Sequence, residues 1–81
     1  MLELYGSSGC PYTAEMRESL EFSRREFVEF DVEADTAAFA RMREITGQRM
    51  VPALLENGRV VEIGWQGRGC VVGVRSEARH A

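Results

Sequence analysis

The residue best suited to covalent chemistry is Cys10, which lies between the segment Gly6-Ser7-Ser8-Gly9 and Pro11. The segment indicates a turn at the end of a strand, and proline is favoured in the first turn of a helix because its missing N–H would be unpaired there. A cysteine at such a junction faces unpaired backbone N–H groups and the positive end of the helix dipole, which stabilise a thiolate. The position therefore predicts a reactive thiol rather than a structural cysteine.

The second cysteine, Cys70, is sixty residues away and forms no C-x-x-C pair with Cys10. This spacing does not indicate a zinc site, and two cysteines are too few for a disulfide-rich secreted scaffold. Cys70 is either a resolving thiol, brought to Cys10 by the flexible glycines 67 and 69, or a small packing residue beside two valines. Spacing alone cannot establish the geometry of a disulfide, and the sequence slightly favours packing.

Three further side chains belong to the candidate site. Tyr12 either flanks the sulfur or is a surface aromatic, and the sequence does not separate these two roles. The hydroxyl of Thr13 lies about one turn beyond Cys10, and donation to the thiolate is favoured over a residue that is merely tolerated there. Trp65 either stacks over a substrate or fills an uncovered face of the sheet, and the second role is favoured.

The elements that position these residues follow from hydrophobic periodicity and turn signals. Residues such as Val28 and Phe30 alternate with acids, which predicts a strand with one buried face. Asn57-Gly58 is the strongest short signal for a two-residue hairpin turn. The predicted order is a strand at 2–4, a helix at 11–23, a strand at 28–32, a helix from the cap Asp35 to Gly47, and strands at 53–56 and 59–63. The first two strands must be parallel and the last two antiparallel, so a mixed sheet is expected.

Length and composition exclude several classes of protein. Eighty-one residues, 44% apolar and 28% charged, predict one folded domain, assigned to 1–72, with a loose tail at 73–81. No apolar stretch approaches the ~20 residues of a membrane span, so no membrane association is expected. An acid at position 3 is atypical of a signal peptide, which predicts a cytoplasmic protein. The net charge of −3 argues against nucleic acid as a partner.

Two motifs carry a resemblance to the glutaredoxin family. The sequence Cys10-Pro11-Tyr12-Thr13 resembles the C-P-Y-C active site with threonine in place of the second cysteine, and Met50-Val51-Pro52 resembles the T-V-P segment. The resemblance implies a thioredoxin-like β-α-β-α-β-β fold with a mixed four-stranded sheet. It also implies that the Val51–Pro52 bond is cis, that both residues form the wall opposite Cys10, and that the backbone of Val51 is unpaired and ready for an extended substrate such as glutathione.

A narrower resemblance covers nearly the whole predicted domain. The opening S-S-G-C-P-Y-T and the ending G-W-Q-G-R-G-C resemble the small prokaryotic UXX-star group, in some members of which selenocysteine occupies the position of Cys10. Such a site would be built to stabilise an anionic chalcogen nucleophile.

The chain departs from the glutaredoxin pattern at residues that the resemblance links to glutathione. Ser7 replaces a common lysine, for which Arg49 is a partial substitute. The Gly-Gly turn is represented by Gly64-Trp65, followed by Gln66 instead of an acid. The third helix that follows this turn is reduced or absent, so Val71 and Val72, or a partner chain in a homodimer, would have to cover the sheet.

The resulting hypothesis is a thiol-disulfide oxidoreductase of glutaredoxin type without a metal or nucleotide cofactor. The Cys10 thiolate attacks a disulfide, most plausibly a glutathione mixed disulfide or a protein disulfide, and becomes thiolated. It is then released by Cys70 or, in a monothiol route, by glutathione or another small thiol. Two alternatives are a module that shares an iron–sulfur cluster between two copies, against which Pro11 argues, and a redox-inert interaction domain.

Overall fold

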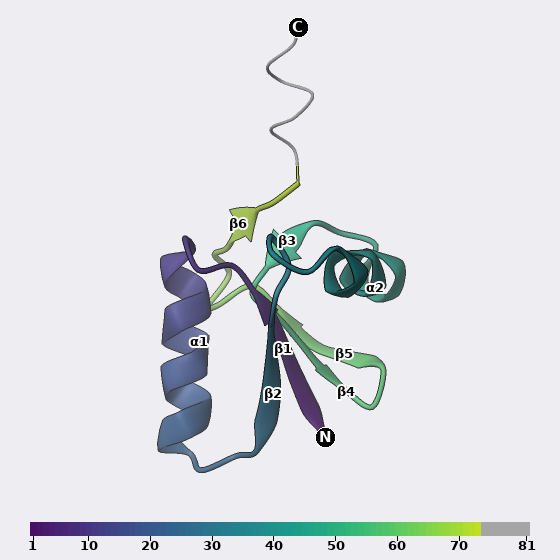
Figure 1. Ribbon diagram of the computed structural model, residues 1–81. Coiled ribbons are helices and arrows are strands. Elements are labelled where there is room, and N and C mark those ends of the chain that lie inside the picture. Colours follow the sequence, from purple (N-terminus) through teal and green to yellow (C-terminus); the bar gives the residue numbers. More distant parts are fainter. Residues whose placement is uncertain (74–81) are drawn as a thin grey trace, which may run out of the picture.

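The computed structural model describes residues 1–73 and contains a mixed four-stranded sheet with one helix on each side (Figure 1). The expected loose tail therefore lies outside the described residues from position 74 onward. The elements are, in order, β1 Leu2–Gly6, α1 Pro11–Phe22, β2 Phe27–Asp31, α2 Thr36–Thr46, β3 Met50–Val51, β4 Ala53–Glu56, β5 Arg59–Ile63 and β6 Cys70–Val71. The thioredoxin-like order expected from the sequence is confirmed, with β3 and β6 as additional short strands.

The main sheet has the strand order β2-β1-β4-β5. The pair β1–β2 is parallel, because α1 carries the chain from one strand to the next, whereas β4 is antiparallel to both β1 and β5. The β4–β5 hairpin turns at Asn57 and Gly58, whose φ angles of 53° and 83° are both positive. This is the backbone that a two-residue hairpin turn requires and that Asn-Gly adopts readily.

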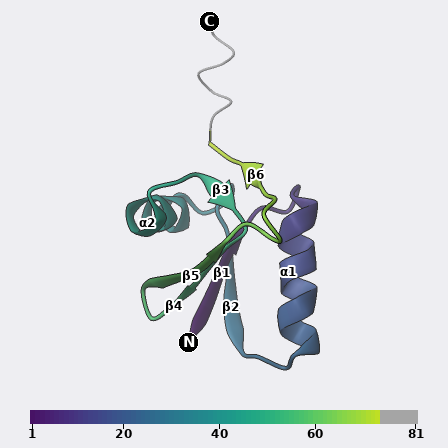
Figure 2. The same ribbon diagram turned by 180° about the vertical axis from the view of Figure 1, so that it is seen from behind.

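Helix α1 covers one face of the sheet, and the reverse view shows α1 and α2 on opposite sides of it (Figure 2). The apolar stripe of α1 buries Met16 and Leu20 against alternate residues of β1 and β4. Trp65 packs against this cluster and covers part of the same face, as the sequence favoured. The buried residues of this cluster are Leu2, Leu4, Met16, Leu20 and Leu54.

Helix α2 covers the other face. It begins after Asp35, whose side chain accepts a hydrogen bond from the Ala38 N–H at 3.1 Å, and ends at Gly47 with a left-handed φ of 73°. Both boundaries match the sequence prediction. The cluster beneath α2 contains Cys10, and Cys70 packs against it, so the packing of this face also positions the two cysteines.

Two expectations about the sheet are wrong. Val28 on the edge strand β2 is exposed, because the cluster beneath α2 is reached only by the later residues of that face, Phe30 and Val32. Phe30 also stacks on Tyr5, at 4.9 Å between ring centroids. Val72 is buried beneath α2, and Val71 is 58% exposed, so the two valines do not replace the third helix. Within residues 1–73 the chain after β5 forms a turn and the strand β6 instead of that helix.

None of the helices in the described part of the chain has the length and apolar character needed to span a bilayer.

Candidate active site

Cys10 is the N-cap residue of α1, directly after the turn that ends β1. Its N–H donates to the carbonyl of Ser7 at 3.1 Å, and its own carbonyl accepts from the N–H of Thr13 at 3.1 Å, so the turn holds the residue at the helix N-terminus. Pro11 follows at the first helical position and is exposed. Cys10 therefore lies between the end of β1 and the N-terminus of α1, as the sequence predicts.

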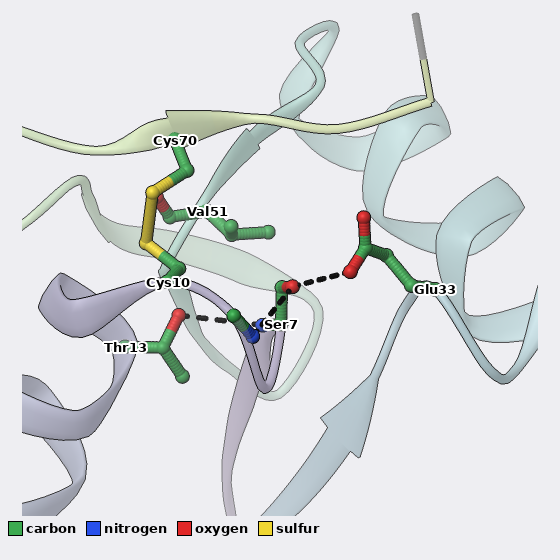
Figure 3. Close-up of a disulfide and its surroundings, with 7 residues drawn as sticks. Ser7, Cys10, Thr13, Glu33, Val51 and Cys70 are labelled. Carbon is green, nitrogen blue, oxygen red and sulfur yellow. Dashed lines mark hydrogen bonds between the residues drawn. A yellow bond between two sulfur atoms is a disulfide. The ribbon is translucent and has the colours of Figure 1, made fainter. Parts of the chain in front are cut away.

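The sulfur of Cys10 is bonded to Cys70 (Figure 3). The two Cα atoms lie 6.0 Å apart, in the range usual for disulfides. Cys10 is only 3% exposed in this state, whereas Cys70 is half-buried. The slight preference for a packing role of Cys70 was wrong, because the chain after β5 returns to the site by a route that sequence spacing does not reveal.

Cys70 reaches Cys10 because β6 pairs with β3 in a separate two-stranded sheet. The ladder is antiparallel and places Met50 opposite Val71 and Val51 opposite Cys70. The N–H of Val72 donates to the carbonyl of Arg49 at 2.9 Å, so the alternation of an antiparallel ladder makes Val51–Cys70 the pair that exchanges backbone hydrogen bonds. The expectation of an unpaired Val51 backbone is therefore wrong for this state.

Val51 and Pro52 nevertheless form the wall opposite Cys10. The peptide bond between them is cis, as the resemblance implies, and the carbonyl oxygen of Val51 lies 3.9 Å from the Cys10 sulfur. Both residues are buried. This short β3 edge is bounded by a proline without an N–H and lies beside the Cys10 sulfur.

A tight turn at residues 65–68 returns the chain to β3. Gln66 and Gly67 have φ angles of 55° and 82°, and the backbones of Trp65 and Arg68 exchange hydrogen bonds of 2.6 and 3.0 Å across the turn. Gly64, which precedes the turn, is buried with a φ of 87° and donates its N–H to Pro52 at 2.7 Å. Gly64 and Gly67 therefore position β6, although the sequence predicted only flexibility for Gly67.

Gly69 permits the close approach of β6 to β3. A Cβ at this position would lie 2.6 Å from the carbonyl oxygen of Val51 and 2.8 Å from Cγ of Met50. Any side chain here would therefore push the two strands apart. This requirement was not predicted from the sequence, in which the only signal is a glycine directly before the cysteine.

The hydroxyl of Thr13 does not contact the Cys10 sulfur in the described hydrogen bonds. Thr13 is fully buried, and its Oγ1 accepts from the N–H of Ser7 at 3.3 Å (Figure 3). The bond that the structure shows is a structural one that fixes the turn before α1, and donation to a Cys10 thiolate has no counterpart in this disulfide state. The turn leaves the Ser7 N–H inside the protein, where it needs an acceptor.

Ser7 belongs to a second polar contact that the sequence analysis missed. Its hydroxyl donates to Oε1 of Glu33 at 2.5 Å and accepts from the N–H of Gly9 at 3.3 Å. Glu33 follows β2, and the carboxyl ends of the parallel strands β1 and β2 lie at one edge of the sheet, so topology could have indicated the contact. Within residues 1–73, no group of three or more His, Cys, Asp or Glu side chains is placed to share a metal ion.

The remaining candidate residues lie around β6. Tyr12 is half-buried and packs, together with Cys70, against the cluster that contains Cys10. Nη1 of Arg49 donates to the carbonyl of Gly73 at 3.3 Å, so this side chain contacts the segment that follows β6. Trp65 contacts the α1 face of the sheet, and its buried Nε1 has no hydrogen-bond partner in the described structure.

Comparison with solved structures defines the class of fold. The thioredoxin-like protein BC3987 is 30% identical, with a TM-score of 0.70 over 75% of this chain and 84% of its own. A mutant of that protein gives 31% identity and a TM-score of 0.73 over 80% and 82% of the two chains. Buckwheat glutaredoxin, in a glutathione complex, is 20% identical with a TM-score of 0.65 over 78% of this chain and 59% of its own. The fold is thioredoxin-like.

The sequence model of the glutaredoxin family matches residues 2–61, which is well over half of the chain. The protein therefore belongs to the glutaredoxin family. No curated protein shows significant similarity to it. Membership of this family supports a thiol oxidoreductase-type function, and the narrower resemblance to the UXX-star group stays a prediction.

Proposed function

We propose that this protein is a dithiol–disulfide oxidoreductase in which Cys10 is the nucleophile and Cys70 is the resolving thiol. The observation that carries the proposal is the Cys10–Cys70 disulfide, which joins the helix N-cap to β6 across 60 residues. In a reducing compartment, such as the cytoplasm predicted from the sequence, a disulfide of this kind is expected to be transient and catalytic.

The reaction proceeds in two exchanges. The Cys10 thiolate attacks one sulfur of a substrate disulfide, forms a mixed disulfide with it and releases the other substrate thiolate. The Cys70 thiolate then attacks the Cys10 sulfur, closes the Cys10–Cys70 disulfide and releases the second substrate thiolate. The substrate gains two electrons, the protein dithiol loses them, and the thiol protons pass to the products through solvent.

The residues around the sulfur have positioning roles in this scheme. Tyr12 packs beside the cysteines, the Val51 backbone and Pro52 form the wall opposite Cys10, and Gly64 starts the turn that returns Cys70. Two exchanges with a small thiol such as glutathione would regenerate the dithiol, with no metal or nucleotide cofactor.

Glutathione is a reasonable cosubstrate because the buckwheat neighbour is described as a glutathione complex. Ser7 stands where the family pattern has a lysine that binds glutathione, and it donates to Glu33 instead; Arg49, the partial substitute for that lysine, contacts Gly73. This favours Cys70 over external glutathione as the group that resolves the mixed disulfide.

Mass spectrometry after addition of oxidised glutathione tests the proposal. The reduced wild-type chain should lose about two hydrogens and give a linked Cys10–Cys70 peptide, because the intramolecular attack outruns release by external thiols. Cys70→Ser should accumulate a stable glutathione adduct on Cys10, and Cys10→Ser should accumulate none at that position.

Other results would select a different function. A stable adduct on Cys10 of the wild-type chain, with Cys70 free, would establish the monothiol route. Absence of any reaction at Cys10 would favour a redox-inert interaction domain. An iron–sulfur absorbance spectrum from anaerobically purified protein would favour the cluster-binding alternative.

A further inference from the structure

We propose that β6 is an internal competitor for the substrate position, so that substrate and β6 occupy the β3 edge in turn and the return of β6 expels the reduced product. This inference rests on the proposed function of Cys10 and Cys70 and assigns a role to the strand that carries Cys70. It also predicts the substrate class, which is a disulfide whose cysteine lies in an extended peptide with a small residue before it.

A substrate and β6 would use the same two groups of the protein, the Cys10 sulfur and the Val51 backbone. The nucleophilic sulfur of Cys10 makes a single S–S bond at a time, and in the described state its partner is Cys70, whose backbone pairs with Val51. A substrate cysteine in a mixed disulfide takes the one S–S bond of Cys10 that Cys70 holds in the described state. If the substrate backbone is extended, the nearest free edge is the same Val51 backbone, so the substrate and β6 exclude each other.

Without the disulfide, few contacts hold β6 against β3. It is a two-residue strand paired with a two-residue strand, outside the main sheet. Its other described attachments are the buried Val72 side chain, the Val72–Arg49 backbone bond and the contact of Arg49 with Gly73. Short, edge-located segments of this kind open locally at low free-energy cost. Reduction of the disulfide therefore makes the β3 edge available.

The residues of β6 indicate which substrate peptides can pair with the β3 edge. Gly69 lies where a Cβ would meet the Val51 carbonyl at 2.6 Å, so the residue before a bound cysteine must be glycine-like. Val71 points outward and is 58% exposed, whereas Val72 is buried beneath α2 at 5% exposure. A substrate that replaces β6 should therefore carry a small residue before its cysteine and an apolar residue two positions after it.

Resolution by Cys70 is linked to product release. When Cys70 attacks the Cys10 sulfur, β6 must pair with Val51 again, because that pairing brings the two Cα atoms to 6.0 Å. The same pairing removes the substrate strand from β3. The bond that forms is Cys10–Cys70, the bond that breaks joins Cys10 to the substrate, and the substrate leaves as a thiolate without its backbone partner.

Stopped-flow kinetics in a Cys70→Ser background isolates the first exchange. The probe is the peptide Arg-Gly-Cys-Val-Val, which copies residues 68–72, as its mixed disulfide with thionitrobenzoate; attack on the peptide sulfur releases the coloured thionitrobenzoate anion. A second peptide carries alanine in place of glycine. The glycine peptide should react about tenfold faster, because the alanine Cβ meets Val51 as a residue-69 Cβ would.

Substitutions on the protein test the competition itself. In the same background, Gly69→Ala should accelerate the glycine peptide severalfold, because it displaces β6 from β3. The matched control is Gly47→Asn, at the end of α2, where a Cβ meets nothing within 4 Å and asparagine is a common residue in the left-handed conformation. This control should leave the rate unchanged. With Cys70 present, Gly69→Ala should slow release of the bound peptide, because β6 returns less readily.

Amide hydrogen exchange gives an independent readout in the wild-type chain. Reduction should accelerate exchange of the Val72 N–H, which bonds to Arg49 in β3, and leave the Val32 N–H, which bonds to Gly6 in β1, unchanged. Equal rates for both peptides, or a rate unaffected by Gly69→Ala, would overturn the inference while leaving Cys10 a reactive nucleophile. Failure of Cys10 to react with either peptide and with oxidised glutathione would instead contradict the proposed function.

Discussion

Cys70 lies opposite Val51 in the β3–β6 ladder, and this pairing brings its Cα to 6.0 Å from that of Cys10. One short ladder therefore determines both the partner of the reactive sulfur and the occupancy of the backbone next to it. The chain thus covers the β3 edge beside Cys10 with its own strand.

Reduction should destabilise the protein. The disulfide closes a loop across 60 residues, and its loss restores chain entropy to the unfolded state. We expect the free energy of unfolding to fall by about 2–4 kcal/mol when the wild-type chain is reduced. Urea unfolding with and without dithiothreitol measures the change. Cys70→Ser should resemble the reduced chain and be insensitive to dithiothreitol; a large effect of the reductant on that variant would assign the change to another cause.

Thr13→Val should lower stability without lowering the reactivity of Cys10. The substitution removes the oxygen that accepts the buried Ser7 N–H, which should cost about 1–3 kcal/mol. Thr13→Ser keeps the acceptor and should cost less, although it loses a methyl group. Alkylation of reduced Cys10 by iodoacetamide should proceed at a similar rate in both variants. A strong loss of reactivity in Thr13→Val alone would show that Thr13 donates a hydrogen bond to the thiolate.

Gly6→Ala should be strongly destabilising. A Cβ at this position would collide with Cγ2 of Thr13 and lie 2.8 Å from its Oγ1, and Thr13 is fully buried. Overpacking of this kind typically costs about 1–3 kcal/mol. Gly9→Ala in the same turn is the control, because a Cβ there meets nothing within 4 Å. Thermal unfolding of the two variants should show a clearly lower midpoint for Gly6→Ala, and equal midpoints would contradict the prediction.

Tyr5 should make stability sensitive to alkaline pH. Burial and the hydrogen bond from its hydroxyl to Glu3 raise the pKa of Tyr5 above 10, against the opposing effect of Arg41. The folded state thus favours the neutral phenol, so this contribution is present below about pH 10 and is lost as pH rises through the folded pKa.

Urea unfolding in a Cys10→Ser, Cys70→Ser background, in which no thiol titrates, checks this sign. Tyr5→Phe should cost about 1 kcal/mol at neutral pH through the lost hydroxyl bonds. Above pH 10 its stability should fall less steeply than that of the parent. A parallel decline in both proteins would show that Tyr5 is not the titrating group.

Local signals in the sequence predicted most of the elements. The helix cap at Asp35, the stop at Gly47 and the Asn57-Gly58 turn each act within a few residues, so their geometry depends on local backbone and side-chain chemistry. The junction that holds Cys10 at the start of α1 is predictable for the same reason. The motif around it also led to the family.

The contacts of the site depended on pairings between distant parts of the chain. Val28 alternates correctly for a half-buried strand, yet it is exposed because periodicity does not say how far along β2 the cluster beneath α2 extends. For Thr13 the sequence favoured a hydrogen bond to the Cys10 thiolate, and only the path of the turn places the Ser7 N–H against its oxygen.

The sequence by itself determined the chemistry available to this protein: a cysteine at a helix N-terminus, a second thiol, and a Val-Pro wall. The tertiary structure alone decided that Cys70 meets Cys10 and that β6 covers Val51. The physical reason is that a two-residue strand has too little periodicity to be recognised in a sequence. The position of β6 depends instead on its pairing with β3, about twenty residues away in the chain. The turn at 65–68 and the space left by Gly69 make that pairing possible.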